Sequence, residues 1–194
     1  MLKKLCVYCG SSVGKRPEYH EGAKQLAKIL VSRGIDLVYG GAAIGVMGII
    51  ADAVLEGGGK VTGIIPEDLM GKEVAHQGIT ELMVVPSMHE RKAVMADISD
   101  GFIALPGGIG TLEELFEIFT WAQLGFHSKP VGLLNINGYF DNLIKFLDTA
   151  VDEQFMNITH RSMLVVEHDP ELLIQRLKSY ESPVLKKWID REAT

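Results

Sequence analysis

The amino-acid sequence predicts an α/β protein whose sheet is doubly wound, mainly parallel and about seven strands wide, with helices on both faces. Short β-branched runs alternate along the 194-residue chain with longer stretches of helical periodicity. Several of the short runs are apolar at every position, as expected of strands that are buried on both faces. No internal repeat or change of composition marks a linker, so one domain over residues 1–194 is predicted.

Along the chain, each predicted strand is followed by a predicted helix, except the third strand, which is followed by a loop. Strand 5–8 precedes helix 18–32, strand 36–39 precedes helix 43–56, and strand 61–65 precedes the segment 67–78, which has no clear period and is predicted to be a loop. Strand 82–85 precedes helix 88–99, strand 101–105 precedes helix 112–124, strand 131–134 precedes helix 139–153, and strand 163–166 precedes helix 169–180. Right-handed crossovers follow from this order.

The composition is that of an ordinary globular protein, with 47% apolar and 23% charged residues. The net charge is −6 and no block of Lys or Arg occurs, which argues against nucleic acid or an anionic membrane as the main partner. A small phosphorylated ligand remains compatible with this charge. No signal segment or membrane-spanning run is recognised, and two cysteines do not suggest a disulfide scaffold, so a cytoplasmic protein is expected.

Three of the predicted strands end in turns rich in glycine. The first leads into Cys9-Gly10-Ser11-Ser12, the second into a turn that begins Tyr39-Gly40-Gly41, and the fifth into Pro106-Gly107-Gly108-Ile109-Gly110-Thr111. In an open parallel sheet, ligands bind outside the carboxyl ends of the strands, near the point where the strand order switches. The functional site is therefore expected at this rim of the sheet.

The segment from Pro106 to Glu114 directly follows a predicted strand and opens a helix. Glycines let the backbone approach a phosphate closely, and a helix N-terminus offers unpaired N–H groups and the positive end of its dipole. The pattern therefore favours a phosphate site. The alternative interpretation is a tight turn in which Thr111 is the N-cap and Glu114 completes a Thr-x-x-Glu capping box.

The helix that follows this turn is apolar on two sides. One stripe of helical spacing consists of Leu112, Leu115, Phe116, Phe119 and Ala122. Ile118 and Trp121 are expected on the opposite side, together with Glu114. Because one side should face the sheet, the other is expected to meet a second subunit, and the sequence predicts a homodimer.

Two adjacent carboxylates, Glu113 and Glu114, would repel each other beside a phosphate unless a cation balances them. The segment Met88-His89-Glu90-Arg91-Lys92 opens the preceding helix and is expected to place Arg91 and Lys92 on the same rim. Arginine stays charged and can bind phosphate or ribose through bidentate hydrogen bonds. The alternative is a solvated basic pair on a helix surface.

Other catalytic patterns are not supported. Cys6 and Cys9 are three residues apart at a predicted strand, so their side chains are expected on opposite faces and are interpreted as packing residues. The six histidines are scattered, and neither a zinc site nor a redox site is predicted. No G-x-S-x-G elbow occurs, so a serine-centred triad is not predicted either.

Two motifs together resemble a known family. Residues 106–114 match the pattern PGGxGTxxE, and Met88-His89-Glu90-Arg91-Lys92 matches MHxRK. The sequence closely resembles the LONELY GUY family, the cytokinin riboside 5′-monophosphate phosphoribohydrolases, and the similarity extends through residues 9–12, 39–41, 69–73, 120–125 and 129–135. Members of this family are often labelled lysine decarboxylases, but nothing in this sequence suggests a lysine site for pyridoxal phosphate.

The resemblance implies a Rossmann-like homodimer and a hydrolase that needs neither a metal nor an organic cofactor. It implies that Arg91 and Glu114 are the catalytic pair and that Lys92 assists binding. The residues implied to hold the 5′-phosphate are Gly107, Gly108, Gly110 and Thr111. Further substrate-binding positions are Glu73, Thr120, Met88, Ile109, Leu112, Glu113 and the turn residues Gly10, Ser11, Gly40 and Gly41.

The predicted reaction is hydrolysis of the N-glycosidic bond of an adenosine 5′-monophosphate, with or without an N6 substituent, to free base and ribose 5-phosphate. Glu114 would stabilise the oxocarbenium character that develops at C1′, and Arg91 would fix the ribose or phosphate. Two alternatives stay open. One is a nucleotide- or phosphosugar-binding module without chemistry, and the other is a purely structural dimer in which Glu114 caps a helix.

Overall fold

The computed structural model describes residues 2–70 and 75–183, which form a seven-stranded sheet with parallel pairing throughout. The strand order is β4-β3-β2-β1-β5-β6-β7. The strands are β1 (Lys4–Tyr8), β2 (Asp36–Tyr39), β3 (Val61–Pro66), β4 (Glu81–Val85), β5 (Gly101–Ala104), β6 (Val131–Leu134) and β7 (Leu164–Glu167). This architecture confirms the predicted doubly wound, Rossmann-like α/β fold.

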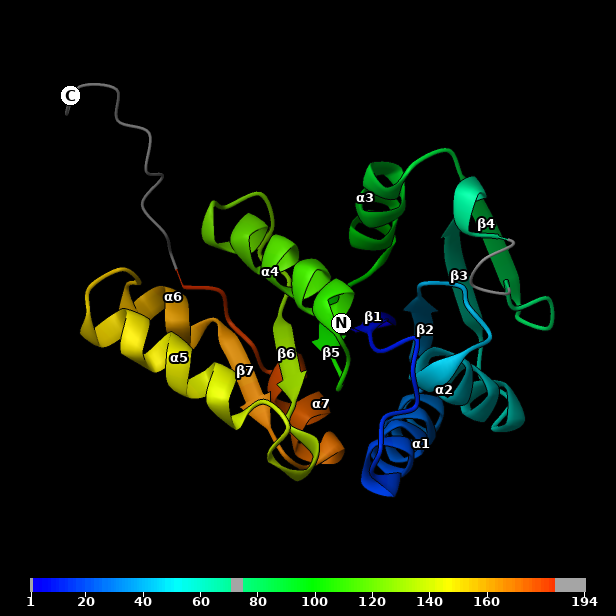
Figure 1. Ribbon diagram of the computed structural model, residues 1–194, viewed down its shortest axis with the longest axis horizontal. Helices are drawn as coiled ribbons and strands as arrows, with labels where there is room; N and C mark the ends of the chain where they lie inside the picture. The colour runs from blue at the N-terminus through cyan, green and yellow to red at the C-terminus, as the bar shows by residue number, and fades with distance from the viewer. Residues whose placement is uncertain (1, 71–74, 184–194) are drawn as a thin grey trace.

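Helices cover both faces of the sheet (Figure 1). One face is covered by α1 (Pro17–Ser32), α2 (Gly45–Glu56) and α7 (Pro170–Lys178), and the other by α3 (Met88–Ile98), α4 (Ile109–Gln123) and α5 (Asp141–Asp152). Short turns of 3₁₀-helix occur at η1 (Glu67–Leu69) and η2 (Ile136–Gly138). The segment predicted to be a loop therefore contains one helical turn among its described residues.

A short helix, α6 (Ile158–Ser162), lies between α5 and β7 and was not predicted. Its N-cap is Asn157, whose side-chain oxygen accepts a hydrogen bond from the Thr159 N–H at 2.8 Å. A helix of five residues is too short to show a hydrophobic period, so only its cap distinguishes it in the sequence.

The core has two layers, one on each face of the sheet. Along β1, Leu5 and Val7 pack into the layer beneath α1 and α2, whereas Cys6 and Tyr8 pack into the layer beneath α3 and α4. This alternation is the geometric consequence of a strand whose successive side chains point to opposite faces. Because both faces are covered by helices, every one of these positions is apolar or aromatic.

Helix α4 buries a different stripe from the one predicted. The side chains it buries against the core are Thr111, Leu115, Ile118, Phe119 and Ala122. The prediction that Ile118 lies opposite the core was wrong, because the buried stripe is centred between the two candidate faces. Leu112, Phe116 and Trp121 therefore flank this stripe and are partly buried.

The three glycine-rich turns meet at the carboxyl ends of the strands, as predicted. Strand order switches between β1 and β5, where the chain turns to opposite sides of the sheet. The Gly10 N–H donates to the Pro106 carbonyl at 3.2 Å, and the Gly10 carbonyl accepts from the Val46 N–H at 3.0 Å. Gly45 has a φ of +62° and lies so close to Ser11 that a Cβ would be 2.2 Å from its carbonyl carbon. These contacts fix the first turn between the other two.

His127 gives the fold a specific pH dependence. Its Nε2 donates to the Ile118 carbonyl at 2.8 Å, and its Nδ1 accepts from the Lys129 N–H at 3.1 Å, so the neutral ring satisfies both partners. The pKa of His127 is lowered, mainly because the ring is partly buried. The nearby charge of Lys129 also lowers this pKa, whereas the hydrogen bond to the Ile118 carbonyl raises it. Below the ordinary value of 6.5, the unfolded chain therefore binds more protons than the native state, and stability falls with falling pH.

Between about pH 7.5 and about pH 5.5, we expect the free energy of unfolding to fall less in His127→Gln than in the native protein. Urea unfolding of both proteins at the two pH values measures the difference. Equal losses of stability in the two proteins would contradict this role for His127.

Candidate active site

A cavity of about 280 Å³ opens at the switch point of the sheet. Its walls come from the turn after β1, the start of α3 and the first turns of α4. The described residues that line it are Cys9, Gly10, Ser11, Met47, Met88, Arg91, Gly108, Ile109, Gly110, Thr111, Glu113 and Glu114. The structure thus brings together most of the residues that the two motifs singled out. Sequence reasoning did not assign Cys9 or Met47 to a site, because both are apolar and buried.

Arg91 is a buried cation, with only 5% of its surface exposed. Its Nε donates to the Ile64 carbonyl at 3.1 Å, and its Nη2 donates to the Gly40 carbonyl at 3.0 Å. A Cβ at position 40 would lie 2.1 Å from Nη2, so glycine is needed there to admit the guanidinium. The alternative of a solvated surface position is therefore wrong for Arg91. The second glycine-rich turn contributes to the cavity mainly by holding this side chain.

The N-terminus of α4 forms one wall of the cavity. The helix begins at Ile109, and its N-cap is Gly108, which has no side chain to satisfy the first N–H groups. These donors and the positive end of the helix dipole favour an anion. Thr111 is the third residue of the helix rather than its N-cap, so the capping-box interpretation of Thr111 and Glu114 is wrong.

Glu114 lines the same cavity as Arg91, one turn into α4. Both charges act on the thiol of Cys9, which is also in the wall. Burial raises the pKa of Cys9, the charge of Glu114 raises it further, and Arg91 lowers it. The net shift is upward, so the thiol stays protonated, which agrees with its interpretation as a packing residue. Cys6 and Cys9 belong to opposite core layers, as predicted.

A second pocket, of about 250 Å³, adjoins the same turn. It shares Gly10, Ser11 and Gly108 with the cavity just described and adds Gly107, Tyr19 and Tyr139 among its lining residues. The Tyr139 hydroxyl donates to the Gly107 carbonyl at 2.7 Å. The sequence contained no signal for Tyr139, because the contact depends on β6 lying next to β5.

Known proteins with similar sequences match most of this chain. The family described as possible lysine decarboxylase matches residues 47–177. A cytokinin riboside 5′-monophosphate phosphoribohydrolase of Arabidopsis thaliana is 52% identical over 180 residues, which are 93% of this chain and 83% of that protein. A probable member from Oryza sativa subsp. japonica is 53% identical over 179 residues, 92% of this chain and 79% of the relative.

The chain belongs to the cytokinin riboside 5′-monophosphate phosphoribohydrolase family. This confirms the resemblance to the LONELY GUY family that the two motifs indicated. The family's fold also occurs in more distant proteins of known structure. The molybdenum cofactor binding protein from Rippkaea orientalis matches with a TM-score of 0.68 at 24% identity. The match covers 92% of this chain and 97% of the Rippkaea chain. At this identity the likeness concerns the fold alone.

Lys92, the neighbour of Arg91 in the phosphoribohydrolase motif, does not itself line the cavity but pairs with Glu113, which does. Its Nζ lies 2.5 Å from Glu113 Oε1 and 3.0 Å from Glu117 Oε2, and 13% of its side chain is exposed. Desolvation alone would lower the pKa of Lys92, but hydrogen bonds to Glu113 and Glu117 outweigh it and raise the pKa. The cation thus offsets the charge of Glu113 and links α3 to α4.

Other motif positions of the phosphoribohydrolase family lie away from the cavity or outside the described residues. Thr120 is exposed and donates to the Phe116 carbonyl at 2.6 Å, about 13 Å along α4 from Thr111. Leu112 packs against the core, and Gly41, with a φ of +81°, shapes the second turn. Glu73 lies outside the described residues.

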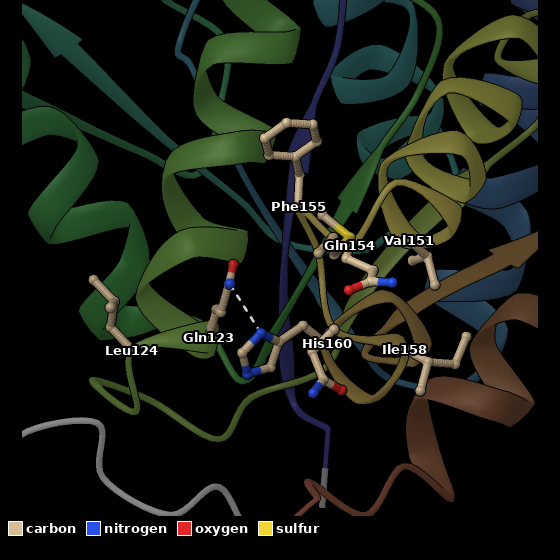
Figure 2. A pocket seen from close by; sticks show the side chains of 9 residues that line it. Gln123, Leu124, Val151, Gln154, Phe155, Ile158 and His160 are labelled. Atoms are coloured by element: carbon tan, nitrogen blue, oxygen red, sulfur yellow. Dashed lines mark hydrogen bonds between the residues drawn. The ribbon is translucent and has the colours of Figure 1, made fainter.

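A larger hollow of about 530 Å³ lies at the other end of α4 (Figure 2). Gln123 Nε2 donates to His160 Nδ1 at 2.9 Å in this hollow, and Leu124, Phe155 and Ile158 lie around the pair. The lining includes neither the glycine-rich turns nor Arg91 or Glu114. This hollow is therefore separate from the candidate active site.

Within residues 2–70 and 75–183, no group of three or more His, Cys, Asp or Glu side chains is arranged to hold a metal ion. No helix in the same part of the chain combines the length and the hydrophobicity needed to cross a membrane.

Proposed function

We propose that this protein hydrolyses the N-glycosidic bond of an adenine-type nucleoside 5′-monophosphate and releases the free base and ribose 5-phosphate. The observation that best supports the proposal is one cavity that contains Arg91, Glu114 and the N-terminus of α4. A phosphate site alone would not require a buried arginine and a carboxylate in the same cavity. The names of the similar proteins from Arabidopsis and rice describe the same class of reaction.

The 5′-phosphate is proposed to bind at the first turn of α4, where Gly108, Gly110 and Thr111 line the cavity. The free N–H groups of this turn and the helix dipole attract a dianion. Binding energy from the phosphate then positions the ribose, although the phosphate takes no part in the bond that breaks. This explains why a monophosphate, rather than a nucleoside, is the proposed substrate.

The reacting bond is proposed to lie between Arg91 and Glu114. As the bond from C1′ to the purine nitrogen breaks, its electron pair leaves with the base and positive charge develops on the ribose. The carboxylate of Glu114 stabilises that charge and accepts a proton from the attacking water, whose oxygen bonds to C1′. The leaving base gains a proton, so water is divided between the two products. Arg91 fixes the ribose or phosphate and balances the negative charge in the cavity.

The base is proposed to contact two apolar side chains at the mouth of the cavity. Met88 is 41% exposed and Ile109 is 81% exposed, although both line the cavity. Exposed apolar side chains beside a polar site offer the flat face of a purine a surface to cover. They also offer contact area for an N6 substituent, and one added apolar group changes affinity by about 1–3 kcal/mol.

Incubation of the purified protein with AMP, and separately with N6-isopentenyl-AMP, tests this function. We expect chromatography to detect free base and ribose 5-phosphate in equal amounts, and the ratio of the two rates gives the preference for the base. Binding of both nucleotides without release of base would contradict the proposal and favour a binding module. A nucleotide that binds the native state raises the melting temperature by mass action, which identifies that outcome.

We also propose that two copies of this chain form a homodimer through the hollow at the end of α4. Leu124, Phe155 and Ile158 line that hollow and are 57%, 90% and 65% exposed. Contiguous exposed apolar surface of this kind is typical of a protein interface. Thr120 is on the same helix, one turn earlier, so a second copy could place it beside another chain's site. The partly buried Trp121 is near the same end of α4.

Sedimentation velocity at micromolar concentration tests this assembly. We expect a dimer for the native protein and a monomer for the double variant Phe155→Asp, Ile158→Asp, because each substitution would bury a charge in an apolar interface. Phe146→Asp is the matched control, since Phe146 is 65% exposed on α5 but does not line the hollow. A monomeric native protein would rule out the dimer.

A further inference from the structure

Tyr139 connects the loop after β6 to the glycine-rich turn after β5. It directly follows η2, and its hydroxyl donates to the Gly107 carbonyl at 2.7 Å. The ring meets Tyr19 edge-on, with ring centroids 5.4 Å apart and an interplanar angle of 78°. It also meets Phe140 edge-on at 4.9 Å. These contacts fix where the hydroxyl lies relative to the turn.

The hydrogen bond constrains one particular peptide group. In a trans peptide, the carbonyl of one residue and the N–H of the next point in opposite directions. Tyr139 is on the carbonyl side of the peptide between Gly107 and Gly108, so the Gly108 N–H points away from Tyr139. Tyr139 lies in the second pocket, whereas Gly108 also lines the cavity that contains Arg91 and Glu114. The Gly108 N–H is therefore on the side of the peptide away from Tyr139, and Gly108 itself lines the cavity.

The turn itself does little to select this orientation. A Cβ on Gly107 would lie 2.1 Å from Thr111 Oγ1 and 2.8 Å from the Gly10 nitrogen, so the position requires glycine. A peptide flanked by two glycines can rotate at little steric cost, because neither residue has a Cβ to restrict its backbone. An external hydrogen bond to the carbonyl is thus a means of holding the peptide in one orientation.

We propose that Tyr139 is a positioning residue for the 5′-phosphate: its hydroxyl holds the Gly107–Gly108 peptide so that the Gly108 N–H faces the phosphate. The inference rests on the proposed function, because it takes the cavity at the start of α4 as the phosphate site. The contact acts on substrate, transition state and product alike, since all three contain the same phosphate. Its loss should therefore raise KM and leave kcat unchanged.

Tyr139→Phe tests the proposal, because it removes the hydroxyl and keeps the ring against Tyr19. We expect KM for AMP to rise about fivefold, the usual worth of one hydrogen bond, with kcat within about twofold of the native value. Calorimetry should show ribose 5-phosphate binding weakened by the same factor, and adenine binding unchanged. Tyr139 is 43% exposed, so water can solvate the Gly107 carbonyl and the melting temperature should change little.

Tyr180→Phe is the matched control, since Tyr180 lies in another pocket, beside α7. Unchanged KM and unchanged ribose 5-phosphate affinity in Tyr139→Phe would overturn the proposal. A fall in kcat together with a fall in melting temperature would overturn it as well, because that result indicates a general structural role. If the native protein binds ribose 5-phosphate but does not cleave AMP, the proposed function fails, and the binding comparison still tests Tyr139.

Discussion

Glu114→Gln is expected to lower the turnover of AMP at least about 100-fold, the scale of one positioned catalytic group. Glutamine has nearly the same shape and keeps an oxygen that accepts hydrogen bonds, but it has no negative charge. The variant therefore loses both the electrostatic stabilisation of the ribose cation and the base for the attacking water. Because the substrate can still bind through its phosphate, we expect the loss in kcat rather than in KM.

Glu117→Gln is the matched control for this variant. Glu117 is on the same helix, pairs with Lys92 at 3.0 Å and does not line the cavity. The Glu117→Gln substitution removes one negative charge from α4, as Glu114→Gln does, but leaves the proposed site unchanged. Initial rates of base release for the native protein and both variants make the comparison. Turnover of folded Glu114→Gln close to the native rate would exclude Glu114 from the chemistry.

Arg91→Ala is the second change for which we expect a loss of at least about 100-fold in turnover. The guanidinium is the buried cation of the cavity, and without it the charges of Glu114 and a phosphate dianion would repel each other. The substitution also removes the donor to the Ile64 and Gly40 carbonyls. Leaving buried acceptors unsatisfied costs about 1–3 kcal/mol each, so unfolding in urea must be measured beside activity.

Two further variants separate the chemistry of Arg91 from its effect on folding. Arg91→Lys keeps the charge but cannot reproduce both hydrogen bonds of the planar guanidinium, so we expect turnover between that of the native protein and Arg91→Ala. Lys129→Met is the control, because Lys129 also donates to a backbone carbonyl, that of Ala96 at 2.7 Å, but is remote from the cavity. Full activity in stable Arg91→Ala would refute the assignment.

Much of the fold could be predicted from local patterns. The runs around Leu5, Val38 and Phe102 are apolar at successive positions, which only a strand covered on both faces requires. All seven predicted strands occur, with ends that differ by one residue at most. The glycine-rich turns also lie where predicted, because parallel strands place all their carboxyl ends at one edge of the sheet.

The orientation of individual side chains was harder to predict from the sequence. Ile118 was predicted to face away from the core but is buried in it. Which stripe of α4 is buried depends on the rotation of the helix about its own axis relative to the sheet. Lys92, which was predicted to assist binding, pairs with Glu113 and Glu117 on the next helix, and the sequence contained no sign of these two ion pairs. The first outcome depends on how α4 packs against the sheet and the second on where α4 lies beside α3, and neither helix contains that information by itself.

The sequence by itself determined the α/β class, the positions of the strands, the rim at which the candidate site lies, and the family. These depend on periodicity, glycine placement and short motifs, which are local properties of the chain. Only the tertiary structure decided that Gly40 makes room for the guanidinium of Arg91, and that Tyr139 contacts the turn at Gly107. Each of these contacts joins residues more than 30 positions apart, so it exists only once the strand order has brought distant turns together.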